Sequence, residues 1–274
     1  MRTVVFWSLL FLYATLPAAA RTIRVAFPPG WGAGWNDPRL VYHLLAGEPE
    51  RFGCHQFLFQ DLAQPVTYAG LEAAAPDVVV LCNPSGGDRT YQTTEGGALA
   101  SYLADHDAGL VGTYKFNHSF FLYDNSFLMD LFGVDGSFFT YDSQCTTGIY
   151  VLQPPRHEIF SCLFGDRFTT AGYPCSQAIS APSWDDAMAG ADIIAGTTDD
   201  NGIIAVREIP WRSVYCSTMP DYCDTTTGDP WLVYAMLVWA AGYDTSPALP
   251  ACGSAAGLLL AGVVSGLLLA CRKS

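Results

Sequence analysis

The sequence predicts an α/β domain built on a doubly wound, mostly parallel sheet with helices on both faces. The first observation is a regular alternation of short apolar runs with helix-like segments between residues 22 and 114. Such alternation is typical of parallel strands joined by crossover helices. The second observation is composition. Half of the residues are apolar and 14% are charged, which supplies a large core and excludes a disordered chain. Right-handed crossovers then favour helices on both faces.

Four strands and three helices are predicted in this first part of the chain. The strands are 23–27, 56–59, 77–82 and 109–114, and the helices are 37–45, 68–75 and a segment that begins at Thr93. Asp37 followed by Pro38 is the usual order for a helix cap and a first helical turn. The third strand is apolar after Asp77, so we expect it to be buried on both faces of the sheet.

The second part of the chain is less regular. Strands are predicted at 191–196, 203–207 and 213–216, the last two as a hairpin-like pair through Pro210, and helices at 125–131 and 230–241. Residues 135–190 are rich in aromatic residues and turns and contain several cysteines. We expect them to form an irregular, cysteine-bearing insertion in the domain.

The N-terminus has the pattern of a cleaved signal peptide. One arginine precedes an apolar run from Val4 to Leu16, and the small residues 18–20 follow it. This run is short for a membrane span, and its flanks match the order of charge, apolar region and cleavage site. We therefore expect residues 1–20 to be removed and residues 21–246 to form an extracytoplasmic domain.

The C-terminus has the pattern of a membrane anchor. Residues 255–271 are uncharged and largely apolar, and Arg272 and Lys273 follow them. The length is near the lower limit for a spanning helix, and the basic pair would hold its end in the cytosol. This predicts a single-pass type I protein of the cell surface or an endomembrane. A GPI signal cleaved near residues 244–246 is the alternative.

Charge and cysteine content limit the partners and the compartment. The net charge of −13 argues against nucleic acid as a partner. Nine cysteines are present, and all but Cys271 lie in the predicted extracytoplasmic part, which suits disulfides in an oxidising compartment. The candidate pairs are Cys216 with Cys223 and Cys162 with Cys175. Asn117 lies in a glycosylation sequon. No pattern of residues predicts a metal or an organic cofactor.

Three segments should meet at the carboxyl ends of the predicted strands, where α/β sheets of this kind bind ligands: 28–35, 83–88 and 113–117. The ligand-binding candidates there are Trp31, Ser85, Gly86, Gly87 and Tyr114. Glycines after a strand let backbone N–H groups face a ligand, although a simple strand-to-helix turn has the same composition. Aromatic side chains could stack on a sugar ring, or they could belong to the core.

The order of four motifs resembles a known family. These are residues 77–87 (DVVVLCNPSGG), 109–114 (GLVGTY), 212–221 (RSVYCSTMPD) and 229–242. The first two resemble the core of the class I glutamine amidotransferase-like superfamily. The last two resemble the closing strand and helix of its ThuA-like (trehalose-utilisation-like) branch. The resemblance spans roughly residues 22–243 and implies a flavodoxin-like fold.

The same resemblance implies that glutaminase chemistry is absent. Tyr114 stands where the family has its nucleophilic cysteine, and the histidine common at that place in the ThuA-like branch is missing too. The family's closing His-Pro-Glu corresponds to Met219, Pro220 and Asp221. A cysteine nucleophile needs a base that a third group orients, and these residue types do not provide it. The resemblance thus implies a domain that binds a small-molecule or carbohydrate-like ligand in the cleft at the strand ends.

Two other functions stay open at this point. The first is a carbohydrate-related hydrolase or isomerase with a non-cysteine mechanism around Tyr114, His118 and Asp221. The second is a surface protein that recognises a protein partner through residues 135–190. The sequence does not identify the ligand or the oligomeric state, and it leaves open whether any catalysis remains.

Overall fold

The computed structural model describes the greater part of the predicted extracytoplasmic domain and neither end of the chain. The described residues are 21–28, 39–52, 55–82, 90–113, 125–135, 139–141, 149–160, 167–169, 177–179, 190–197, 202–218, 220–221, 229–243 and 245. The predicted signal peptide and the predicted tail helix at 255–271 lie outside this range. Among the described residues, no helix has the length and apolar character needed to cross a membrane.

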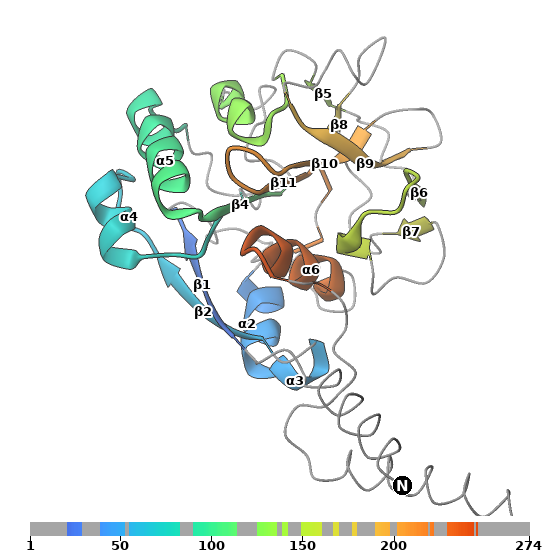
Figure 1. The fold of residues 1–274 in the computed structure, drawn as a ribbon, viewed down its shortest axis with the longest axis horizontal. Helices are drawn as coiled ribbons and strands as arrows, with labels where there is room; N and C mark the ends of the chain where they lie inside the picture. The colour runs from blue at the N-terminus through green and yellow to red at the C-terminus, as the bar shows by residue number, and fades with distance from the viewer. Residues whose placement is uncertain are drawn as a thin grey trace, which may run out of the picture.

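Five parallel strands form the first half of the sheet, in the order β2-β1-β3-β4-β11 (Figure 1). Their bounds are β1 Thr22–Phe27, β2 Gln56–Asp61, β3 Val78–Leu81, β4 Gly109–Gly112 and β11 Ser213–Cys216. The predicted strands in this half are therefore confirmed, with ends that differ by a few residues. All four residues of β3 are buried, as their apolar character predicts for a central strand covered on both faces.

Antiparallel strands extend the sheet beyond β11. Strand β10 pairs with β11 in the predicted hairpin, and β9, β6 and β7 follow in that order. A further strand, β8, pairs with both β10 and β5. Their bounds are β5 Phe139–Tyr141, β6 Ile149–Leu152, β7 Arg167–Thr169, β8 Gln177–Ile179, β9 Asp192–Thr197 and β10 Gly202–Arg207. The described parts of 135–190 thus contain short strands that join the main sheet.

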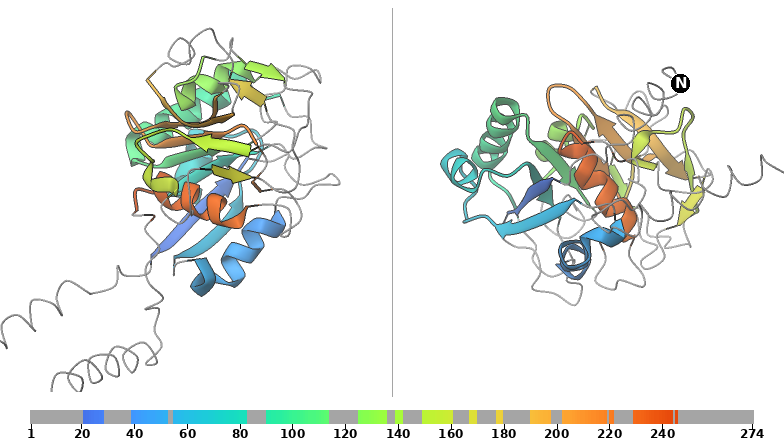
Figure 2. Two further views of the ribbon diagram at one scale, coloured as in Figure 1. Left: turned by 90° about the vertical axis from the view of Figure 1, so that its right-hand side faces the viewer. Right: turned by 60° about the horizontal axis from the view of Figure 1, so that its bottom comes forward.

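Helices cover both faces of the parallel strands, which confirms the doubly wound architecture (Figures 1 and 2). One face holds α2 Arg39–Gly47 and α6 Pro230–Ala240, together with α3 Pro49–Phe52 and the 3₁₀ helix η4 Glu158–Phe160. The other face holds α4 Tyr68–Ala74, α5 Thr93–His106 and the 3₁₀ helix η2 Ser126–Phe132. Strand side chains alternate between these faces: Val78 and Val80 pack toward α2 and α6, and Val79 and Leu81 toward α4 and α5.

Helix α6 lies unusually close to the sheet. Asp229 caps it by accepting a hydrogen bond from the backbone N–H of Leu232 at 3.0 Å, and Pro230 occupies its first turn. Residues 232–240 are all buried, because the sheet and the neighbouring segments surround the helix. At the start of β4 a Cβ on Gly109 would lie 2.2 Å from the carbonyl oxygen of Ala240. Only glycine permits this approach of strand and helix.

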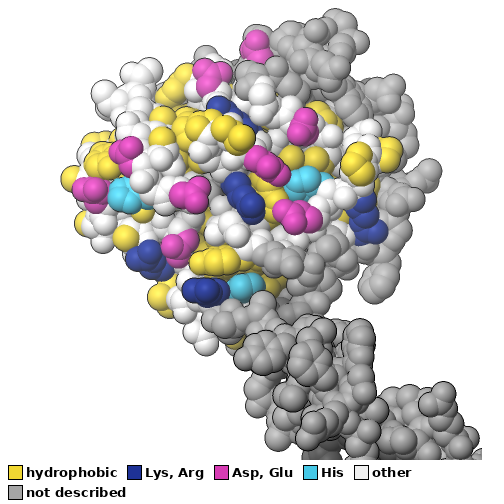
Figure 3. Space-filling view, in the orientation of Figure 1, with side chains coloured by type: hydrophobic (Ala, Val, Ile, Leu, Met, Phe, Trp, Pro, Cys, Tyr) yellow, Lys and Arg dark blue, Asp and Glu magenta, His cyan; other side chains and the backbone are white. Residues whose placement is uncertain are grey.

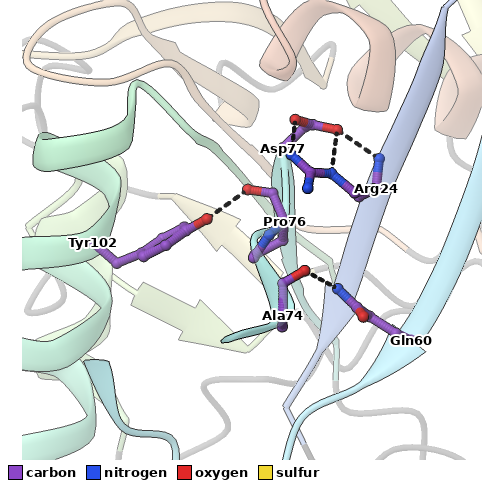
Figure 4. A network of polar contacts seen from close by, with 6 residues as sticks. All are labelled: Arg24, Gln60, Ala74, Pro76, Asp77 and Tyr102. Carbon is purple, nitrogen blue, oxygen red and sulfur yellow. Dashed lines mark hydrogen bonds and ion pairs between the residues drawn. The ribbon is translucent and has the colours of Figure 1, made fainter. Parts of the chain in front are cut away.

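A polar network joins the elements at the amino ends of the parallel strands (Figure 4). Asp77 accepts hydrogen bonds from the backbone N–H of Arg24 at 2.7 Å and from its Nη2 at 3.2 Å. The hydroxyl of Tyr102 on α5 donates to the carbonyl oxygen of Pro76 at 3.0 Å. The connection between α4 and β3 is thereby fixed to both β1 and α5. On the surface seen in Figure 3, acidic and basic side chains are intermixed with apolar ones.

Candidate functional site

The carboxyl ends of β3, β4 and β11 lie side by side, as the sequence predicts. Leu81 pairs with Gly112, and Gly112 pairs with Tyr215. The backbone N–H of Thr113 continues the ladder by donating to the carbonyl oxygen of Leu81 at 2.9 Å. In doubly wound sheets this edge is where ligands bind. The residues that follow these strands are therefore the candidate site.

A buried cluster of three polar side chains occupies this edge. The Thr113 hydroxyl, directly after β4, donates to Asp221 Oδ2 at 2.9 Å. The Tyr42 hydroxyl, from α2, donates to the same oxygen at 3.1 Å. Asp221 is 3% exposed, and Tyr42 and Thr113 are each 1% exposed. The cluster thus brings together a helix near the start of the domain, a central strand and a segment near its end.

Burial controls the electrostatics of this cluster. It raises the pKa of Asp221 from 3.8 to about 6, and the hydrogen bonds from Thr113 and Tyr42 oppose that shift. Burial also raises the pKa of Tyr42 well above its usual value, and the neighbouring Asp221 adds to this effect. Tyr42 is therefore a hydrogen-bond donor at neutral pH and not a base or nucleophile. Asp221 is the group in the cluster that changes its charge within the physiological range.

Cys216, at the end of β11, is a buried free thiol. Cys223 lies outside the described residues, so the predicted Cys216–Cys223 disulfide stays a prediction. On β11 the Cys216 side chain packs into the core beneath α2 and α6, and its Sγ lies 3.1 Å from Thr218 Oγ1. Burial raises the pKa of this thiol to about 12, so it is protonated and a poor nucleophile.

The next residue, Ser217, is completely buried. Among the described residues its hydroxyl has no hydrogen-bond partner. A buried hydroxyl without a partner costs about 1–3 kcal/mol, so such a group usually has a water or a ligand as its partner. This feature is the one sign, among the described residues at this edge, of a polar group that a ligand could satisfy.

Most of the residues predicted for the site lie outside the described residues. They are Trp31, Ser85, Gly86, Gly87, Tyr114, Asn117, His118, Cys162, Cys175 and Cys223. Of the candidates, only Asp221 and Cys216 are described, and Asp221 is found at the predicted edge. The sequence did not indicate Tyr42, and it placed the segment 113–117 at this edge without singling out Thr113. A tyrosine within the apolar stripe of a helix was the available signal for Tyr42, since a buried phenol needs a hydrogen-bond partner.

The described residues give no basis for a metal centre. No three histidine, cysteine, aspartate or glutamate side chains in them are grouped so that they could hold an ion. The cluster supplies one carboxylate and two hydroxyl donors, which is a set for hydrogen bonding. Among the described residues of this edge, no nucleophile lies beside a base.

Solved structures with the same fold include two ThuA-like proteins. The protein named as ThuA-like from Bacteroides uniformis aligns with a TM-score of 0.55 at 12% identity, over 85% of this chain and 96% of that one. The protein named as ThuA-like from Parabacteroides merdae aligns with a TM-score of 0.51 at 12% identity, over 82% of this chain and 92% of that one. No protein-family model and no curated protein matches the sequence.

These likenesses establish the fold and nothing about activity, because the identities are low. The chain shares the doubly wound α/β fold of these two proteins, which is the fold that its motifs predicted. That Tyr114 and Met219 replace catalytic residues stays a prediction from the sequence.

Proposed function

We propose that this chain is a membrane-anchored, extracytoplasmic protein with a ThuA-like fold that binds a small molecule or carbohydrate at the carboxyl ends of its strands. It does not hydrolyse glutamine. The anchor is the apolar segment 255–271, and the signal peptide is residues 1–20. Both assignments come from the sequence, and the proposal rests on them for location and on the described cluster for chemistry.

The observation that carries the proposal is the environment of Asp221. By the motif order, Asp221 stands where the amidotransferases have the acidic residue that orients their catalytic histidine. Here its Oδ2 accepts hydrogen bonds from Thr113 and Tyr42, and the side chain is buried. A buried carboxyl group that accepts hydrogen bonds from two core hydroxyls connects the elements around it, and it is poorly placed to orient a catalytic base. This supports a scaffold that keeps the fold and serves binding.

The charge of the edge favours a neutral or cationic ligand. Among the described residues, the pKa of Asp221 responds to burial and to hydroxyl donors, and no cation contributes. An anionic ligand near this carboxyl group would meet repulsion without a compensating charge. The buried Ser217 hydroxyl is available to a ligand that carries hydroxyl or amide groups. Neutral carbohydrates and polyols combine these properties, and Trp31 and Tyr114, predicted from the sequence to belong to this site, would supply stacking surfaces.

A hydrolase or isomerase acting on carbohydrate-like substrates is the second candidate. The observation in its favour is that the pKa of Asp221 is raised to about 6, because general acids and bases work best near the ambient pH. Tyr114 and His118 would have to provide the other groups. Its weakness is the 3% exposure of Asp221, which places the carboxyl group beneath the surface.

The mature protein, prepared from a secretory host, tests the proposed signal peptide, the proposed anchor and the proposed absence of glutamine hydrolysis. Intact mass should show that residues 1–20 are absent and residues 272–274 are present, whereas a lipid-exchanged tail would indicate GPI anchoring. Glutamine hydrolysis should equal that of the Asp221→Asn variant, which serves as the blank. Activity that disappears in Asp221→Asn, on glutamine or on a glycoside, would overturn the binding proposal in favour of an enzyme.

The ligand is sought on an immobilised glycan array. Neutral glycans should bind, and Trp31→Ala should weaken their binding at least tenfold. The matched control is Ile209→Ala, which removes an exposed apolar side chain before the start of β11, at the opposite end of the parallel strands. Equal loss in both variants, or binding confined to sialylated and sulfated glycans, would contradict the assigned site and ligand class.

A further inference from the structure

We infer that Asp221, Tyr42 and Thr113 form a proton-responsive latch between α2, the end of β4 and the segment at 220–221, and that its buried carboxyl group makes the folded domain more stable in mildly acidic than in neutral solution. The inference does not require a ligand. It concerns how the core beneath the candidate site responds to the compartment in which the protein works.

The geometry makes these three residues a connection between distant parts of the chain. Tyr42 is 179 residues from Asp221 in the sequence, and Thr113 is 108 residues from it. Both hydroxyls donate to the same oxygen of Asp221. The segment is tied further to α6, because the backbone N–H of Asp229 donates to the carbonyl oxygen of Pro220 at 2.8 Å. One carboxyl group therefore lies at the point where α2, β4 and the approach to α6 meet.

Among the described residues, the titratable groups around this cluster are a phenol, two thiols and a second carboxyl group. Tyr42 faces it from α2, Cys82 follows β3, Cys216 ends β11, and Asp229 begins α6. Burial keeps the phenol of Tyr42 and the thiol of Cys216 in their neutral forms, since it raises the pKa of both. Asp229 is a second buried carboxyl group whose pKa burial raises, so any contribution it makes has the same sign. No neighbour in this set supplies a positive charge to an ionised Asp221.

The direction of the pH effect follows from these facts. In the unfolded chain Asp221 titrates near 3.8, and in the folded chain its pKa is about 6. A pKa that folding raises contributes stability that is complete below the unfolded value and is lost as the pH rises through the folded value. The stability that the protonated Asp221 contributes is therefore lost between pH 4 and about pH 6.5. Between pH 5 and pH 7.5, this one group should change the folding equilibrium constant about tenfold.

Urea unfolding of the full-length protein at pH 5 and pH 7.5 provides the test. In the wild type, the equilibrium constant at pH 7.5 should shift toward the unfolded state by about tenfold more than in Asp221→Asn. Asp77→Asn is the control for the loss of a carboxyl group, because this aspartate lies in the exposed network at the opposite end of the strands. Asp229→Asn measures the contribution of the second carboxyl group. Equal pH dependence in the wild type and Asp221→Asn would overturn the inference.

A second variant keeps the test decisive if Asp221→Asn does not fold. Thr113→Val removes one donor to the carboxylate and retains the carboxyl group. Because that hydrogen bond lowers the pKa of Asp221, its loss should raise this pKa further. The folding equilibrium constant of Thr113→Val should then depend more steeply on pH than that of the wild type. An unchanged or shallower dependence in Thr113→Val would contradict the latch.

Discussion

The two ends of the parallel strands each place an aspartate at a junction of elements, under opposite conditions. At the carboxyl ends, Asp221 is 3% exposed and accepts hydrogen bonds from the neutral hydroxyls of Tyr42 and Thr113. At the amino ends, the side chain of Asp77 is 29% exposed and pairs with the guanidinium and backbone N–H of Arg24. The first carboxyl group is shielded from water and has no cation beside it among the described residues. The second has both water and a cation.

The difference explains why the carboxyl end is expected to respond to pH. Removing a carboxylate from water disfavours its charged form, and hydroxyl donors compensate only in part. A half-exposed ion pair keeps its hydration and contributes little net stability, since solvent screens it. We therefore expect that the amino end is held by packing and neutral hydrogen bonds, and that the carboxyl end is held by contacts that depend on the protonation of Asp221.

The largest effect should come from the packing of the amino end. In Gly109→Ala the new Cβ would meet the backbone carbonyl of Ala240 at 2.2 Å, and neither strand nor helix can move without disturbing the core. Overpacking of this kind costs about 3 kcal/mol in the free energy of unfolding, and sometimes more. The measurement is urea unfolding at pH 7.5.

Gly97→Ala is the matched control for this prediction. Gly97 lies inside α5, where an added Cβ has nothing within 4 Å, so alanine should stabilise the helix by up to about 1 kcal/mol. A loss below about 1 kcal/mol in Gly109→Ala would mean that α6 can shift away from β4. The amino end would then be less rigid than its packing implies.

An intermediate effect should come from the tyrosine hydroxyl at each end. Tyr42→Phe removes a donor to the Asp221 carboxyl group, and hydrogen bonds to charged groups contribute about 1.5–3 kcal/mol. The loss should be near 2 kcal/mol at pH 7.5, again read from urea unfolding, and smaller at pH 5, where Asp221 is largely protonated.

Tyr102→Phe is the counterpart at the amino end. Its hydroxyl donates to the neutral carbonyl of Pro76, so the loss should be about 1 kcal/mol at both pH values. The comparison fails if the two tyrosine variants show the same dependence on pH, because the two ends would then not differ in their electrostatics.

The sequence predicted the buried strands and helices better than the polar contacts at the strand ends. The apolar residues of β3 and of α6 identify buried elements directly, because continuous burial leaves few polar positions. The partners of Asp221 could not be predicted in the same way. They lie 108 and 179 residues away, and only the tertiary fold brings them to one oxygen. Cys216 shows the same limit: the sequence did not predict that the alternation of β11 turns its thiol into the core.

The smallest effect should come from the ion pair at the amino end. Asp77→Asn retains an oxygen that can accept the hydrogen bond from the backbone N–H of Arg24, and it removes the charge that faces the guanidinium. An exposed pair of this kind contributes about 0.2–1 kcal/mol, and added salt should reduce that contribution further. A double-mutant cycle with Arg24→Gln, measured in low and high salt at pH 5 and pH 7.5, isolates the pair from its neighbours. A coupling above about 2 kcal/mol that persists in high salt would contradict this expectation. It would place Arg24 and Asp77, despite their exposure, among the contacts that fix β1 to β3.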